Sequence, residues 1–134
     1  MTKRARNRRS ALFLLATSGG SLAAFGLPLF LAPLKWAKRL RWRLPEDTDL
    51  AVYWGRSLGA VAIALGLGGL WAARDPWRHR IIFKIVAVVA ALLAGVHVRG
   101  AIERKQPWTE TAEIGLWAAM TIAAIACYPE EPEE

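Results

Sequence analysis

The sequence predicts an all-α fold, an integral membrane four-helix bundle whose helices run up, down, up and down. Four apolar blocks are each long enough to cross a bilayer, whose hydrocarbon core of about 30 Å needs about 20 helical residues. The blocks are continuously apolar and lack the alternation of membrane β-strands. Most tryptophans lie near the block ends, as in an interfacial aromatic belt. The predicted spans cover residues 11–34, 50–73, 81–98 and 111–128.

Composition agrees with a single membrane domain over residues 1–134. The chain has 18 Lys plus Arg against 11 Asp plus Glu, a net charge of +7, and it is 54% hydrophobic. A soluble nucleic-acid-binding domain would spread its apolar residues through amphipathic elements, whereas here they form long blocks. The single cysteine, Cys127, excludes an intramolecular disulfide and is expected to be a small buried residue.

The first predicted span, residues 11–34, contains no charge and follows a basic arm over residues 1–10. This arrangement also fits a cleavable signal peptide, with Ser21-Leu22-Ala23 as the cleavage site. Because the apolar run continues to Leu34, past that site, we expect an uncleaved span.

The second predicted span carries small residues at alternating steps of four and three, which places them on one helical face. Small residues let another helix approach closely, and close packing drives helix association in lipid. We expect this face to pack within the bundle, with a homodimer interface as the alternative. The helix-packing residues are Gly55, Gly59, Ala62, Gly66, Gly69 and Ala73.

The connectors between the four predicted spans are short, so consecutive spans are expected to be antiparallel neighbours. The turn before the third span is Asp75-Pro76, because proline disfavours helix at the residue before it. Pro129 ends the fourth span, and an acidic tail follows over residues 129–134. The fourth span has a weaker small-residue stripe, formed by Ala112, Gly115, Ala119 and Ala126 and interrupted by Ile122.

The connector after the first span alternates basic residues with tryptophan and leucine, which predicts a short helix along the lipid headgroups. Anionic lipid is its expected partner, at about 1 kcal/mol per basic residue near the surface; nucleic acid is not expected. The basic N-terminal arm predicts that both termini lie in the cytoplasm. The headgroup-binding residues are Lys35, Trp36, Lys38, Arg39, Arg41, Trp42 and Arg43.

Antiparallel topology brings the start of the second span, the end of the third and the start of the fourth to one membrane face. We expect an Arg56–Glu113 ion pair there, with His97 as a hydrogen-bonding neighbour. The functional interpretation is a proton-linked gate or a site for a polar headgroup or quinone; the favoured interpretation is a structural ion pair. The predicted polar cluster is Arg56, His97, Arg99, Glu110 and Glu113.

Catalytic and metal-binding motifs are absent from the sequence, so we predict neither a catalytic residue nor a metal site, and no cofactor is indicated. The two histidines, His79 and His97, are expected at opposite membrane faces, too far apart to share a metal. The sequence therefore favours a protein that is not an enzyme.

The stretches Arg56-Ser57-Leu58-Gly59-Ala60, Leu65-Gly66-Leu67 and Ala72-Ala73-Arg74-Asp75-Pro76 resemble the second span of four-span bacterial membrane proteins of the DoxX-like superfamily. The resemblance implies an accessory membrane subunit, in some members linked to thiosulfate:quinone or other redox complexes. We therefore expect a non-enzymatic accessory or scaffold subunit with a membrane protein partner or a second copy of itself. The alternatives are a quinone- or lipid-binding redox accessory protein and a small transporter.

Overall fold

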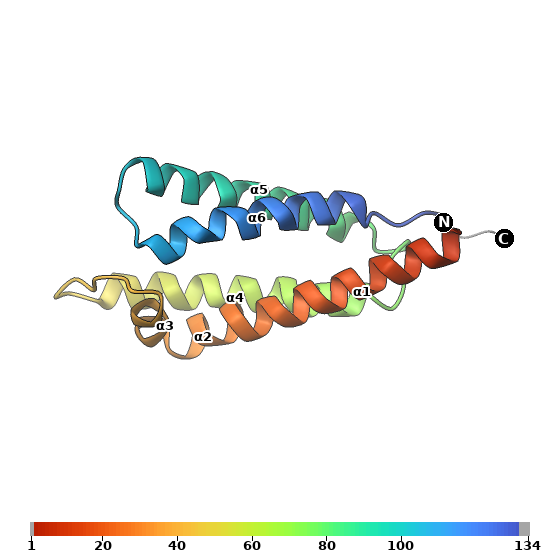
Figure 1. Cartoon of the computed structure of the whole chain (residues 1–134). Helices are drawn as coiled ribbons and strands as arrows, with labels where there is room; N and C mark the ends of the chain where they lie inside the picture. Colours follow the sequence, from red (N-terminus) through yellow and green to blue (C-terminus); the bar gives the residue numbers. More distant parts are fainter. Residues whose placement is uncertain (1, 132–134) are drawn as a thin grey trace.

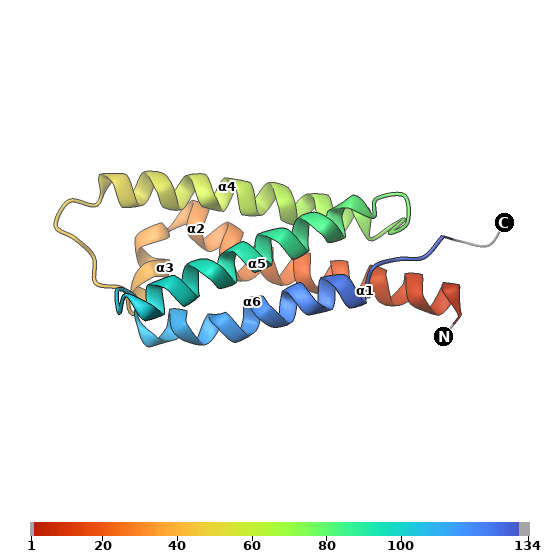
Figure 2. The same cartoon turned by 90° about the horizontal axis from the view of Figure 1, so that it is seen from above.

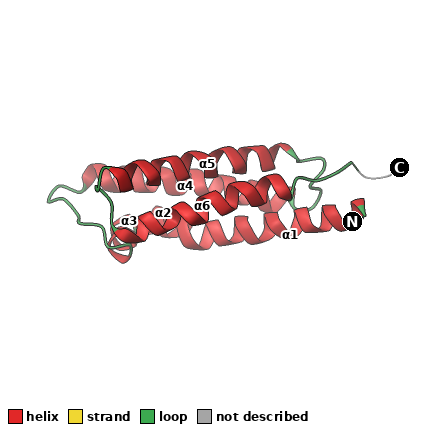
Figure 3. Ribbon diagram, turned by 45° about the horizontal axis from the view of Figure 1, so that its top comes forward, coloured by secondary structure: helices red, strands yellow, loops and turns green. Residues whose placement is uncertain are grey.

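The computed structural model describes residues 2–131, and within this range every regular element is helical, as predicted (Figure 3). Helices satisfy their own backbone hydrogen bonds, which lipid requires. The predicted acidic tail extends beyond the described range at residues 132–134. The elements in order are α1 (Lys3–Ser21), the π-helix η1 (Leu22–Gly26), α2 (Leu27–Leu31), α3 (Pro33–Arg39), α4 (Asp49–Ala72), α5 (Ile81–Ile102) and α6 (Trp108–Ala126).

The helices form two layers (Figure 1). In one layer, α1, η1 and α2 form a continuous helical run that packs along α4; in the other, α5 packs along α6. Both termini lie at one end of the molecule, and α3 and the α5–α6 turn lie at the other (Figure 2). The α5–α6 turn end is where the candidate site is found.

Three helical segments are long and apolar enough to cross a membrane: Lys3–Leu31, Asp49–Ala72 and Ile81–Ile102. The fourth predicted span, α6, is not among them; it is 19 residues long and carries Glu110 and Glu113. Many large apolar side chains are exposed on these helices, including Leu58, Leu92 and Ile122. Such contiguous apolar exposure is rare on soluble proteins and is typical of a lipid-facing surface.

The helix boundaries differ from the prediction mainly at the two ends of the chain. Residues 3–10, predicted as a basic arm, are the first turns of α1, capped by the Thr2 hydroxyl, which accepts a hydrogen bond from the Ala5 N–H. In the C-terminal half, α5 continues to Ile102, four residues beyond the prediction, and α6 begins at Trp108.

The first span is interrupted by η1 and Pro28, and Trp36 compensates for the interruption. Pro28 has no N–H to offer the carbonyl of Ala24, four residues earlier. The indole N–H of Trp36 donates to this carbonyl at 2.8 Å, and the Trp36 ring lies 5.9 Å from that of Phe25. Trp36, predicted as a headgroup residue, therefore also holds α3 against the first span.

The small-residue face of α4 packs against the first span, so it is used inside the protein and not between copies. A Cβ added at Gly59 would overlap the backbone of Phe30, 2.8 Å from its Cα. The backbone of Ala62 lies beside Gly26, and Ala73 packs beside the apolar core. Added Cβ atoms at the α4 glycines would meet the following residues: Pro33 from Gly55, Phe30 from Gly59, Leu22 from Gly66 and Ser18 from Gly69.

An apolar core joins the two layers near the termini. Leu14 of α1, Ala72 of α4, Phe83 of α5 and Cys127 are buried together there. The Phe83 ring stacks on Phe13 with centroids 5.8 Å apart. The buried cysteine therefore contributes to packing, and the polar site lies at the opposite end of the molecule.

A terminal clasp, defined here as Arg6, Asn7, Ser10, Cys127 and Glu130, joins α1 to the segment after α6. The Asn7 side-chain amide donates to the Glu130 carbonyl at 2.9 Å and accepts from the Glu130 N–H at 3.0 Å. The Ser10 hydroxyl donates to the Cys127 carbonyl at 2.6 Å, and Arg6 pairs with the Glu130 carboxylate at 2.7 Å. The start of the predicted acidic tail is thus fixed to the first helix.

Replacing Asn7 by alanine removes both backbone hydrogen bonds of the clasp. Two hydrogen bonds at roughly 0.5–1.5 kcal/mol each predict a loss of about 1–3 kcal/mol in the free energy of unfolding. The measurement is unfolding of the detergent-solubilised protein followed by circular dichroism. Arg9→Ala, an exposed change on the same helix, is the control and should alter stability little; equal effects of the two variants would contradict the assigned role of Asn7.

Candidate functional site

Three side chains of the predicted polar cluster meet between α5 and α6. His97 Nδ1 lies 3.4 Å from Glu110 Oε2, and His97 Nε2 lies 3.7 Å from Glu113 Oε2. His97 is 8% exposed and Glu110 is 6% exposed; the Glu113 side chain is 16% exposed. A buried imidazole between two carboxylates thus forms the centre of the site, called here the His–Glu site.

Helical periodicity explains why these three groups converge. Glu110 and Glu113 are three residues apart and therefore share one side of α6. His97 is in the last two turns of α5, which packs directly along α6 and meets its first turns near the connecting turn. The local fold therefore brings both carboxylates to a single imidazole.

Two tryptophans orient the two carboxylates. The Trp42 indole N–H donates to Glu110 Oε1 at 2.8 Å, and the Trp117 indole N–H donates to Glu113 Oε2 at 3.1 Å. The Trp117 ring also stacks on the His97 ring, with centroids 6.4 Å apart and an angle of 7° between the planes. Each polar group of the site therefore has an aromatic neighbour that restricts its orientation.

Trp42 reaches the site because the segment after α3 docks on the start of α6. The Thr109 hydroxyl donates to the Leu40 carbonyl at 2.6 Å, and the Arg41 guanidinium lies 5.5 Å from the Trp108 ring centre. Arg41 has φ 67°, a left-handed conformation that turns the chain at this point. Arg41 and Trp42, predicted as headgroup residues, therefore contact the protein itself.

Gln106 closes the site on the side of the α5–α6 turn. Its amide nitrogen lies 2.9 Å from the His97 carbonyl and 3.1 Å from the Thr111 hydroxyl, and it donates to both. The Gln106 side chain also fills the space beside Gly100, where a Cβ would collide with it. The turn is thus tied to both helices that carry the site.

Arg56 and Arg99 do not join the site, and the expected Arg56–Glu113 ion pair does not form. Within residues 2–131, the Arg56 side chain makes no hydrogen bond or ion pair, and it is exposed beside Tyr53 and Asp49 on α4. Arg99 instead pairs with Glu103 at 2.8 Å. Hydrogen bonds from Arg99 and then from Lys105 hold the pKa of the Glu103 carboxyl below its usual value.

The remaining predicted headgroup residues fit that role without contacting the site. Lys35, Lys38, Arg39 and Arg43 are exposed at the α3 end of the molecule, where Arg43 lies near exposed Trp108. Positive charge and tryptophan at one end of a helical membrane protein are typical of the lipid interface.

Within residues 2–131, no Lys or Arg side chain forms an ion pair with either carboxylate of the His–Glu site. Among the ion pairs of residues 2–131, the partner of Glu110 and of Glu113 is His97 alone. Two buried carboxylates therefore share one imidazole, which carries at most one positive charge. The three side chains offer a nitrogen and carboxylate oxygens that all lie within 4.8 Å of one another, a set that could hold a metal ion.

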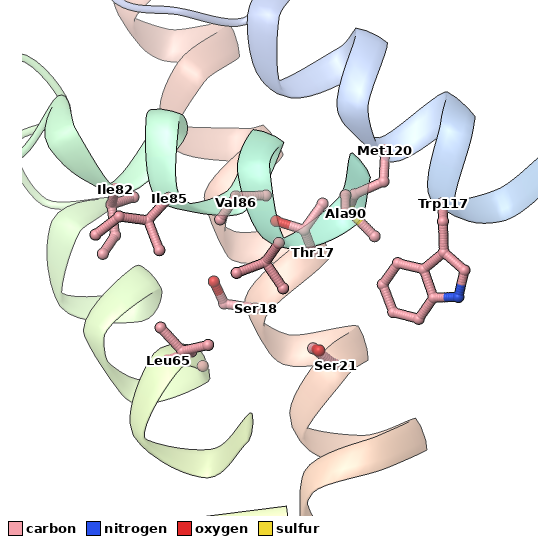
Figure 4. A pocket seen from close by; sticks show the side chains of 12 residues that line it. Thr17, Ser18, Ser21, Leu65, Ile82, Ile85, Val86, Ala90, Trp117 and Met120 are labelled. Atoms are coloured by element: carbon pink, nitrogen blue, oxygen red, sulfur yellow. The ribbon is translucent and has the colours of Figure 1, made fainter. Parts of the chain in front are cut away.

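A small apolar cavity of about 80 Å³ lies between the two layers and ends near the site. The hydroxyl-bearing residues Thr17, Ser18 and Ser21 of α1 line one wall, with Trp117 and Met120 of α6 on the other side (Figure 4). Trp117 therefore separates the cavity from the His–Glu site. No pattern in the sequence predicted this cavity.

No family model, curated protein or solved structure matches this chain.

Proposed function

We propose that the chain is a four-span integral membrane protein, with α6 as the fourth crossing, that acts as a non-enzymatic accessory or scaffold subunit. The observation that carries this proposal is the outer face of α6, called here the α6 outer face. It consists of the exposed small residues Ala112, Gly115, Ala119 and Ala126, with the exposed side chain of Ile122 between the last two.

The α6 outer face lies opposite the buried residues Trp117 and Ala124, so it points away from the rest of the chain. A Cβ added at Gly115 would have no neighbour within 4 Å. In lipid, small faces associate through close van der Waals packing. The comparable face of α4 is filled by the first span, whereas the α6 outer face is left for a helix of another protein.

The proposed placement is the bacterial inner membrane, with both termini in the cytoplasm. Long apolar helices, a basic N-terminal turn and exposed tryptophans near helix ends, among them Trp54, Trp71 and Trp108, support a lipid-embedded position. The proposed relationship to the DoxX-like superfamily supports a role as an accessory membrane subunit.

A second candidate function is a redox accessory protein that binds quinone or lipid. The apolar cavity between the layers favours it, because the Trp117 side chain lies between this apolar space and the polar site. Extraction of the purified protein and mass spectrometry of bound small molecules would detect such a ligand.

Enlarging the α6 outer face tests the accessory-subunit proposal. We expect Gly115→Leu and Ala119→Leu to abolish stoichiometric co-purification of a membrane protein partner in mild detergent. Overpacking by about 2 kcal/mol corresponds to a roughly 30-fold loss of affinity. Quantitative mass spectrometry of the purified complex measures the ratio of partner to protein.

Ala64→Leu on α4 is the matched control, because Ala64 is exposed and lies opposite the α4 small-residue face. This variant should retain the partner, and all three variants should unfold at the same temperature as the wild type. A wild-type protein that purifies alone, or a partner that Gly115→Leu and Ala119→Leu both retain, would contradict the proposal.

A further inference from the structure

We propose that His97, Glu110 and Glu113 bind one divalent transition-metal ion. The proposal concerns the inner side of α6 and does not depend on a partner at the α6 outer face. It stands on four independent observations: the spacing of the three groups, their net charge, an unpaired imidazole nitrogen and the tryptophans around them.

The spacing between the imidazole and Glu110 suits a shared metal better than a direct hydrogen bond. N–H···O hydrogen bonds have donor–acceptor distances of about 2.7–3.2 Å. Two ligands of one tetrahedral metal, each about 2.0–2.2 Å from the ion, lie roughly 3.3–3.6 Å apart. His97 Nδ1 and Glu110 Oε2 are 3.4 Å apart, within this second range.

The charge of the site calls for a cation. Glu110 and Glu113 are both largely buried, and no Lys or Arg of the described chain pairs with either of them. Buried charges are found paired or bound to metals, because an unpaired buried carboxylate is strongly disfavoured. One divalent ion would balance the two carboxylates completely and leave the imidazole neutral, the form in which histidine binds metals.

His97 Nδ1 is a buried nitrogen without a hydrogen-bond partner. Its histidine is 8% exposed, and the atom faces Glu110 across the site. Buried polar atoms in folded proteins are nearly always hydrogen-bonded, so an unpaired one needs an explanation. As a metal ligand, this nitrogen would be satisfied. Glu113 offers a carboxylate oxygen within 4.8 Å of the other ligand atoms and would complete the set.

The tryptophans supply the outer shell that such sites require. Ligating carboxylates in proteins are themselves hydrogen-bonded, which fixes their orientation. Trp42 and Trp117 each donate to a different glutamate, and the Gln106 amide holds the His97 backbone. One imidazole and two carboxylates suit Zn²⁺, Fe²⁺ or Mn²⁺ and do not suit Cu⁺, which prefers thiolate and thioether ligands.

Zn²⁺ titration of the full chain tests the proposal. The protein, solubilised in detergent and stripped with a chelator, is titrated against a competing chromophoric chelator. We expect one Zn²⁺ per chain with micromolar or tighter affinity, and a rise in unfolding temperature that grows with Zn²⁺ concentration. Glu110→Gln and Glu113→Gln should each weaken binding more than about 100-fold. Trp42→Phe should weaken it by about 10–100-fold, as expected for an outer-shell partner.

Two readouts separate the metal site from a structural ion pair. Without Zn²⁺, Glu110→Gln and Glu113→Gln should unfold at or above the wild-type temperature, because each removes a buried negative charge. If His97 were instead an imidazolium that holds the two carboxylates, both variants would lower that temperature. Glu103→Gln, an exposed carboxylate near the same turn, is the control and should bind Zn²⁺ like the wild type. Failure of the wild type to bind one Zn²⁺, or binding unchanged in both glutamine variants, would overturn the proposal.

Discussion

Replacement of Trp117 by alanine is expected to lower the free energy of unfolding by about 3 kcal/mol, the low end of the range for Trp or Phe to Ala in protein cores. The low end applies because lipid is as apolar as the protein interior, so the loss comes from the cavity and the broken contacts. Trp117 is buried, packs 5.4 Å from the Phe25 ring and donates to Glu113. Phe25 belongs to the first span, so Trp117 joins the two layers.

Trp117→Phe separates the two contributions of this side chain. It keeps the aromatic contacts with Phe25 and His97 and removes only the hydrogen bond to Glu113, so about 1 kcal/mol of the loss should remain. Trp54→Ala is the control for the alanine variant, because Trp54 is 63% exposed. Unfolding in detergent, followed by circular dichroism, compares the three variants. Similar losses in Trp117→Ala and Trp54→Ala would show that Trp117 does not connect the layers.

Gly59→Ala is expected to destabilise the protein by about 1–3 kcal/mol, although alanine favours helix more than glycine does. The added methyl group would meet the backbone of Phe30 and the carbonyl of Gly26, and backbone cannot move aside as a side chain can. The two helices would have to separate along this contact. The expected readout is a lower unfolding temperature without loss of helix content in the folded state.

Gly68→Ala on the same helix is the matched control. A Cβ at Gly68 would touch only Ile82 Cδ1, at 4.0 Å, so the change should be neutral or stabilising by up to about 1 kcal/mol from helix propensity. A Gly59→Ala variant as stable as Gly68→Ala would contradict close packing of α4 on the first span.

Helix positions and the α4 packing face could be predicted because both are encoded by local periodicity. Each apolar block ends at charged residues or at the Asp75-Pro76 turn, and these ends indicate where the helices stop. Small residues at steps of three and four positions indicate the packing face of α4. The π-helix could not be predicted in this way, because apolar periodicity does not mark it. Beside it, the Ala24 carbonyl accepts from the Trp36 indole, since Pro28 has no N–H to donate.

The polar cluster was predicted from the depth at which each residue lies in the membrane. Depth does not specify the direction in which a side chain points. Arg56 follows Gly55 directly, so it is rotated by about 100° from the face that packs against the first span. Arg99 is two residues from His97 and therefore points about 200° away from it. Of the five predicted residues, only His97, Glu110 and Glu113 both lie at the same depth and point toward one another. Trp42 had no local signal, since it reaches Glu110 through a chain reversal at Arg41.

The terminal clasp also constrains the order in which the chain can fold. Asn7 and Glu130 are 123 residues apart, whereas the contacts of α1 with α4 and of α5 with α6 join elements that are closer to one another in the chain. Contacts between distant residues carry a larger loop-closure entropy and form late. The two layers can therefore assemble as separate hairpins during synthesis, and the clasp closes only after the last helix has been made. A chain that stops before Glu130 lacks this final step.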